Sequence, residues 1–182
     1  SAYCSFVNGG KLVEPILIDR IQDIEGNTIF NSEKRECKKC NQLSFLNKEV
    51  PKISDNFNQI FTPETAYQIT SMLEGVIQRG TGRKLKNVNL DMAGKTGTTQ
   101  NQSDGWFMGM VPNLSTGVWV GGEDRAIHFE TIGYGQGATM ALPIWGNYMR
   151  TLYENPEFGI SKEDFIADAK KITMKITLGW SI

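Results

Sequence analysis

The sequence predicts an α/β (α+β) fold in which an antiparallel sheet, a β-meander, is flanked by helices. Residues 62–79 carry apolar side chains at three- and four-residue steps, which is typical of an amphipathic helix. Three runs rich in β-branched, aromatic and glycine residues follow, separated only by short turn signals. A second helical pattern then covers residues 141–153. Because strands joined by short turns pair as antiparallel neighbours, we expect a meander between two helices.

Length, composition and charge narrow the class of protein. The 182 residues are enough for one domain or part of one, and 40% of them are hydrophobic, which is enough for a core. The 19 basic and 20 acidic residues nearly cancel, which argues against a nucleic-acid partner. No run of about 18 apolar residues is present that could span a membrane. The chain begins Ser-Ala-Tyr, so we expect it to be a piece of a longer protein.

The first 30 residues predict a helix end and a small hairpin. Residues 1–10 have apolar side chains at helical spacing, and Gly9-Gly10 stop the helix. Residues 11–24 are predicted to be extended, and the turn signal Glu25-Gly26-Asn27 leads into a strand at residues 28–30.

Residues 31–60 have the least regular pattern and contain Cys37 and Cys40 as a lone C-x-x-C. A zinc site of this kind needs two more ligands, and only Cys4 and His128 remain, far apart in the sequence. We therefore predict a surface loop with thiols or a local disulfide, with no metal and no other cofactor. His128 lies in a polar loop and is predicted to be a surface residue.

The two long helices have clear boundaries in the sequence. Thr62 is a good N-cap, Pro63 suits the first helical position, and Gly80 ends the first helix. Its buried stripe is predicted to contain Ala66, Ile69, Met72, Leu73, Val76 and Ile77. The buried side of the second helix is predicted to contain Ile144, Trp145, Tyr148, Met149 and Leu152. We also expect a loose loop at the glycines Gly133, Gly135 and Gly137, and a last short helix from Ser161 to Lys171.

The stretch 91–110 carries the candidate site, at Lys95-Thr96-Gly97-Thr98-Thr99. Its composition suits an edge strand, on which Thr96 and Thr98 share a face. Their hydroxyls would lie about 7 Å apart, since a strand rises roughly 3.4 Å per residue, and could converge on one carboxylate. Gly97 lets another backbone approach, and Lys95 supplies a positive charge. Such an edge is predicted to bind an extended anionic peptide.

The rest of the meander follows directly. Residues 101–104 are predicted to turn, residues 105–111 to form the second strand, and Pro112-Asn113 to turn again. Residues 117–122 are predicted to form the third strand. Trp106, Phe107, Trp119 and Trp145 are expected to be core residues because they alternate or repeat with the period of their elements.

Several of these motifs, in this order, resemble the transpeptidase domain of class A penicillin-binding proteins. The resemblance covers about residues 1–150 and rests on Ala93-Gly94-Lys95-Thr96-Gly97-Thr98-Thr99, on Asp104-Gly105-Trp106-Phe107-Met108-Gly109, on Gly117-Val118-Trp119-Val120-Gly121 and on Ala141-Leu142-Pro143-Ile144-Trp145. Further likenesses are Ala2-Tyr3 with Phe6, Asn8-Gly9-Gly10, and Met72-Leu73 followed by Gly80-Thr81-Gly82.

The resemblance implies a five-stranded antiparallel sheet with helices on both faces, and a peptidoglycan D,D-transpeptidase that works through an acyl-serine enzyme. It implies catalytic roles for Lys95 and Thr98, with the backbone N–H of Thr98 as half of an oxyanion hole. Thr96, Gly97, Thr98 and Thr99 would bind substrate. The implied partners are D-Ala-D-Ala stem peptides, β-lactam antibiotics and the rest of the same domain. The implied location is the periplasmic, extracytoplasmic face of the bacterial inner membrane, reached through an N-terminal part that also carries a glycosyltransferase.

The chain departs from the family pattern because no serine has lysine three residues later; Ser32 has Arg35 there, and arginine cannot act as a base. Ser54-Asp55-Asn56 fits the letters of Ser-x-Asn, but it follows residues 2–10 where the family motif precedes them, so we interpret it as a loop. We therefore expect residues 1–155, with a hairpin and variable loop at 11–60, to be the C-terminal part of the domain. Residues 156–182 would be an extension, and the chain would be inactive alone.

Two alternatives stay open at the level of sequence. A β-lactamase or β-lactam sensor shares the Lys-Thr-Gly motif, and a non-catalytic binding module could retain the sheet without the serine. The sequence upstream discriminates among them, because a Ser-x-x-Lys supports an enzyme and its absence supports a binding module.

Overall fold

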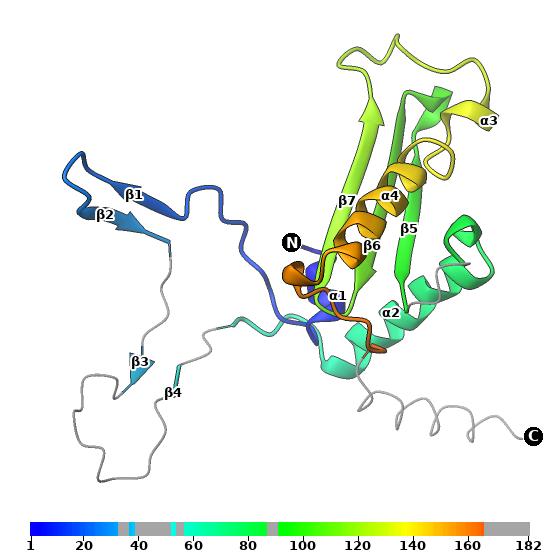
Figure 1. Ribbon diagram of the computed structural model, residues 1–182. Helices are drawn as coiled ribbons and strands as arrows, with labels where there is room; N and C mark the ends of the chain where they lie inside the picture. Colours follow the sequence, from blue (N-terminus) through cyan, green and yellow to red (C-terminus); the bar gives the residue numbers. More distant parts are fainter. Residues whose placement is uncertain (33–36, 39–51, 54–56, 87–90, 166–182) are drawn as a thin grey trace, which may run out of the picture.

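The protein is seen in a computed structural model that describes residues 1–32, 37–38, 52–53, 57–86 and 91–165. Its centre is an antiparallel three-stranded sheet in the order β5-β6-β7 (Figure 1). The strands are β5 (Ala93–Thr98), β6 (Asp104–Val111) and β7 (Leu114–Gly121). The predicted meander is confirmed, and β7 begins earlier than expected because Pro112 and Asn113 alone make the turn.

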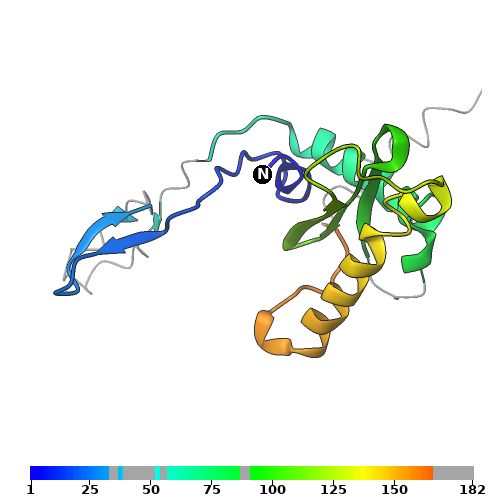
Figure 2. The same cartoon turned by 90° about the horizontal axis from the view of Figure 1, so that it is seen from above.

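Helices cover both faces of this sheet (Figure 2). The short α1 (Cys4–Val7) and the long α2 (Pro63–Gln78) lie on one face, and α4 (Ala141–Glu154) lies on the other. Within the described residues, no helix is both long enough and apolar enough to cross a membrane.

The main core lies between the sheet and α4. The ring of Phe107 is fully buried and meets the ring of Trp145 edge-on, with 5.2 Å between ring centroids. The buried members of this cluster are Ile77, Leu85, Met92, Phe107, Val111, Ala141, Leu142, Trp145 and Met149. Trp145 and Phe107 are thus the core residues that the sequence predicted.

The prediction for the other two tryptophans was wrong, because Trp106 is 44% exposed and Trp119 is 46% exposed. The two residues are directly paired across β6 and β7, with ring centroids 6.4 Å apart. Side chains alternate along a strand, so both tryptophans face away from α4 when Phe107 faces toward it. Strand periodicity gave the alternation correctly, but it could not say which face would be covered along its whole length.

A second buried cluster lies on the opposite face, under α1 and α2. It consists of Ala93, Met110 and Phe165, with Tyr3, Phe6, Val7 and Leu73 packed against it. The single proton of the buried Thr70 hydroxyl is shared between the carbonyl oxygens of Phe6, 2.9 Å away, and Ala66, 3.0 Å away. This contact ties α1 to α2 through a residue that the apolar pattern had not selected.

Both long helices begin near their predicted residues, but their buried stripes are narrower than predicted. Thr62 caps α2 by accepting a hydrogen bond from the backbone N–H of Thr65. Met72 was predicted to be buried and is 67% exposed, because α2 buries the stripe Ala66, Thr70 and Ile77 instead. In α4, Ile144 and Tyr148 are exposed, because Leu142, Trp145 and Met149 take the inner side.

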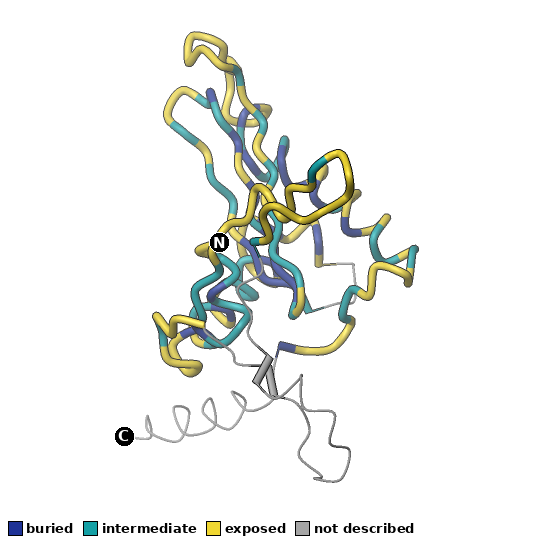
Figure 3. The backbone as a smooth tube through the Cα atoms, turned by 90° about the vertical axis from the view of Figure 1, so that its left-hand side faces the viewer, coloured by how far each residue is buried: buried dark blue, intermediate teal, exposed yellow. Residues whose placement is uncertain are grey.

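The predicted hairpin is present and stands apart from the sheet (Figure 1). It pairs β1 (Arg20–Gln22) with β2 (Thr28–Asn31), so the first strand is much shorter than the predicted extended segment. Hydrogen bonds from the side chain and backbone of Asn27 hold the pKa of the Asp23 carboxyl below its ordinary value. The hairpin is exposed along nearly all its length, whereas the buried positions follow the sheet and its helices (Figure 3).

The remaining predictions concern loops and the C-terminal end. β3 (Cys37–Lys38) pairs with β4 (Lys52–Ile53), and Cys40 lies outside the described residues. A short helix, α3 (Ile132–Gly135), replaces part of the predicted loose loop. The helix predicted from Ser161 is wrong for residues 161–165, which are not helical, and its remainder lies outside the described residues.

Short 3₁₀ helices complete the chain: η1 (Arg83–Leu85), η2 (Gln100–Gln102) and η3 (Pro156–Phe158). After η3 the chain returns to the sheet, where the Asn113 side chain donates to the carbonyl of Gly159 and accepts from the N–H of Ser161. The division of the chain at residue 155 stays a prediction.

Candidate functional site

Strand β5 has a partner on one side only among the described residues, so it is the predicted edge strand. Beyond its last residue, the N–H of Thr99 donates to the carbonyl of Asp104 at 3.1 Å, toward β6. Residues of an antiparallel strand alternately direct their backbone groups toward the partner and away from it. Thr98 and Thr96 therefore direct their N–H and C=O groups to the open edge.

The Lys95 side chain brings a cation to this edge. Its side chain is exposed, and Nζ donates to the carbonyl oxygen of Thr96 at 2.7 Å. Because that carbonyl faces the open edge, the ammonium group lies beside the backbone that an incoming chain would meet. The charge is thus placed where the sequence predicted it.

The hydroxyls of Thr96 and Thr98 lie on the face that α4 covers, since Thr96 pairs with Phe107. Each has one polar neighbour from another part of the chain. Thr96 Oγ1 lies 2.8 Å from Thr81 Oγ1, and Thr98 Oγ1 accepts a hydrogen bond from the N–H of Gly137 at 3.1 Å. Two turns or loops, one before β5 in the sequence and one after it, therefore contact the two hydroxyls.

Thr99, predicted to bind substrate with its neighbours, is engaged differently. Its hydroxyl accepts a hydrogen bond from the N–H of Asp104 at 2.9 Å, and it lies 3.2 Å from the Asp104 carboxylate. It also lies 3.0 Å from the hydroxyl of Ser103. Its side chain thus closes the turn between β5 and β6, and its contact with substrate stays a prediction.

Gly97 has no side chain that could project from β5 beside Lys95. A Cβ built on it would meet the Cβ of Trp106 at 3.2 Å, which is a tight contact. The absence of a side chain leaves the strand next to the exposed indole of Trp106 free of any projection, which suits the close approach of another backbone.

Sequence reasoning missed two residues that the structure brings to β5, Thr81 and Gly137. Both lie beside glycines: Thr81 lies between Gly80 and Gly82, and Gly137 ends the glycine series for which a loose loop was predicted. Local patterns indicate a turn at such residues, but they do not say which strand the turn will contact.

Where the structure describes them, the other candidate residues do not form a second site. Ser54-Asp55-Asn56 lies outside the described residues, and Ser32 donates its hydroxyl to Asp19 in the exposed hairpin. His128 is exposed, with Nδ1 3.1 Å from the carbonyl of Phe129. Across the described ranges, no three His, Cys, Asp or Glu side chains gather where they could hold a metal ion.

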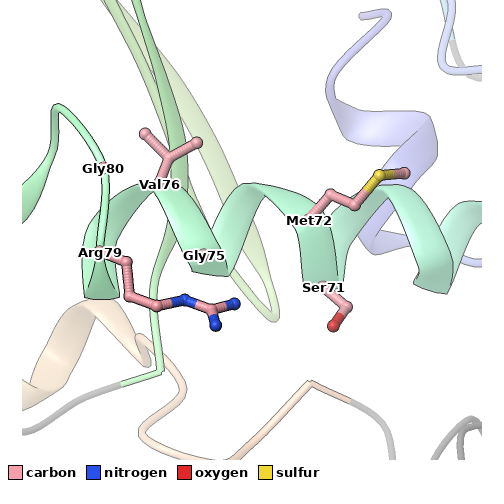
Figure 4. A pocket seen from close by; sticks show the side chains of 6 residues that line it. All are labelled: Ser71, Met72, Gly75, Val76, Arg79 and Gly80. Atoms are coloured by element: carbon pink, nitrogen blue, oxygen red, sulfur yellow. The ribbon is translucent and has the colours of Figure 1, made fainter. Parts of the chain in front are cut away.

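A groove of about 500 Å³ lies along α2, and none of the Lys-Thr-Gly residues lines it (Figure 4). Of the described residues that line it, Arg79 alone is ionisable, and the others are Ser71, Met72, Gly75, Val76 and Gly80. This lining contains no paired acid and base, so the β5 edge is the better candidate for chemistry.

A three-stranded meander between helices, with Lys-Thr-Gly on its edge strand, defines part of a penicillin-binding transpeptidase fold. The sequence-family model described as the penicillin-binding protein transpeptidase domain matches residues 1–123 of this chain. The chain therefore belongs to the penicillin-binding protein transpeptidase family, and the resemblance seen in the sequence is confirmed.

Relatives and solved structures agree with this assignment. Penicillin-binding protein 1A of Rickettsia prowazekii (strain Madrid E) is 35% identical over 159 residues, which are 85% of this chain and 20% of that protein. Penicillin-binding protein 1A of Pseudomonas aeruginosa is 34% identical over 179 residues, 81% of this chain and 21% of that protein. The crystal structure of penicillin-binding protein 1A from Haemophilus influenzae is 32% identical with a TM-score of 0.64, over 85% of this chain and 26% of that one. The chain thus spans about a fifth of the length of the curated relatives it matches.

Proposed function

We propose that this chain supplies the substrate-binding edge of a peptidoglycan D,D-transpeptidase, and that β-lactams bind at the same edge. The observation that carries the proposal is the arrangement of β5. Its edge has no partner strand among the described residues, and the four positions from Lys95 to Thr98 bring a cation and two oriented hydroxyls to it. An extended peptide ending in D-Ala-D-Ala can add to such an edge as a further strand, since this mode uses main-chain hydrogen bonds.

Each group of the edge has a role in this proposal. The outward N–H and C=O groups of Thr96 and Thr98 form hydrogen bonds with the stem-peptide backbone. The hydroxyls of the same two residues donate hydrogen bonds to its terminal carboxylate. Lys95 adds positive charge beside that carboxylate, where a charge-assisted contact is stronger than a neutral one. The N–H of Thr98 stabilises the oxyanion of the tetrahedral intermediate, a contribution of typically about 3–4 kcal/mol.

The nucleophile must come from outside this chain, because no serine here has lysine three residues later. We therefore propose that the chain works beside a Ser-x-x-Lys segment of the same protein, hereafter the full-length protein. In this proposal the full-length protein acts at the periplasmic face of the inner membrane and carries a glycosyltransferase. Its partners are stem peptides, β-lactams and the remainder of its own transpeptidase domain.

Labelling with a fluorescent penicillin, followed by a denaturing gel, tests the proposal. We expect one stoichiometric covalent band for the full-length protein and none for this chain alone, since an unaligned serine or thiol has neither base nor oxyanion hole. A full-length protein that stays unlabelled would remove the proposed function. A stoichiometric band on the isolated chain would show that the nucleophile lies within this chain, contrary to the proposal.

A further inference from the structure

Gly137 contacts the proposed site although it lies far from it in the sequence. Its N–H donates to Thr98 Oγ1 at 3.1 Å, and the residue is buried. A hydroxyl has two acceptor lone pairs and a single proton. Because the Gly137 N–H occupies one lone pair of Thr98, the proton of that hydroxyl is left to donate in another direction, and the Thr98 side chain is exposed.

The position of Gly137 is set by α4. Its carbonyl oxygen accepts from the N–H groups of Ala141 at 3.0 Å and Leu142 at 2.9 Å, in the first turn of that helix. The carbonyl oxygen of the next residue, Ala138, accepts a hydrogen bond from Lys84 Nζ at 3.3 Å. Since α4 is anchored in the core, the Gly137 N–H is held at a fixed place over β5.

The position also requires a residue without a side chain. A Cβ on Gly137 would lie 2.5 Å from the carbonyl oxygen of Gly97 and still nearer to that of Trp106. Both are backbone atoms of paired strands, which cannot move aside as a flexible side chain can. Gly133, in the preceding short helix α3, is different, because a Cβ there would meet only Thr131 Oγ1, at 3.9 Å.

We propose that Gly137 is a positioning residue, whose N–H orients the Thr98 hydroxyl so that it donates its proton to the carboxylate of the bound peptide or β-lactam. This inference rests on the proposed function. A hydroxyl that accepts one hydrogen bond is also a better donor, because neighbouring hydrogen bonds polarise one another. Gly137 therefore contributes to the preference for an anionic ligand without touching the ligand itself.

The test compares acylation of the full-length protein by benzylpenicillin and by its methyl ester, which lacks the carboxylate. We expect Gly137→Ala to lower the acid-to-ester ratio of acylation rates by roughly tenfold or more, since the lost contact is to a charged group. The matched control, Gly133→Ala, should leave the ratio unchanged. A purely structural role for Gly137 would lower both rates together and keep the ratio.

Two failures are distinguishable. If neither compound acylates the wild-type protein, both the proposed function and this inference are ruled out. If the wild type is acylated but Gly137→Ala keeps the acid-to-ester ratio of acylation rates, only the inference is ruled out. If Gly137→Ala does not fold, hydrogen exchange of the peptide containing Gly137 decides. Its amide should exchange faster in Thr98→Val than in Thr98→Ser, which keeps the acceptor, and equal exchange in both would overturn the proposal.

Discussion

The indole of Trp145 lies directly against Gly109, leaving no room for a side chain at that position of β6. The same indole donates from Nε1 to the hydroxyl of Thr116 on β7 at 2.6 Å. One buried side chain therefore fixes α4 across two strands. Because the loop before α4 contacts Thr98, this packing also sets the position of a residue in the candidate site.

Gly109→Ala should destabilise the full-length protein by about 1–3 kcal/mol, because the new methyl group must displace a buried ring. Urea unfolding of the transpeptidase domain measures the change. The control is Gly75→Ala in α2, where the nearest group is the end of the Arg79 side chain at 3.6 Å. That control should stabilise the helix by about 0.5–1 kcal/mol. Equal stability of Gly109→Ala and wild type would mean that α4 does not pack on β6 as described.

The sequence predicted the parts of the fold that depend on local chemistry. The cap at Thr62, the turn at Pro112 and the Lys-Thr-Gly edge strand all follow from residue types within a few positions of one another. The exposure of Met72 and Trp106 did not, because burial depends on which surfaces meet in three dimensions. Periodicity predicts an apolar stripe or an alternating face, but it does not predict which other elements will pack against that face.

The candidate site shows the same division. Lys95, Thr96 and Thr98 were placed on the correct strand, and the shared face of the two threonines follows from the period of two along a strand. Thr81 and Gly137 could not be predicted, because each arrives through a loop whose direction is set by packing at a distance.

We expect the isolated chain to self-associate, or to fold stably only beside the rest of its domain. Trp106 and Trp119 form an exposed apolar pair, and within the described residues β5 and β7 each lack a partner strand on one side. Unpaired edges and exposed apolar patches both favour association. Light scattering across a concentration series measures it, and Trp106→Gln should reduce it. A monomer that unfolds sharply at high concentration would show that the chain covers its own core.

The central claim is that the β5 edge binds the anionic end of the substrate, and Lys95→Ala in the full-length protein tests it most directly. The rate of acylation by benzylpenicillin should fall at least tenfold, since the ammonium group lies at the edge and contributes little to packing. The melting temperature should stay close to that of wild type, and Lys86→Ala, at an exposed lysine after η1, should change neither quantity. A melting temperature lowered by many degrees, with unchanged acylation of the folded protein, would contradict the claim.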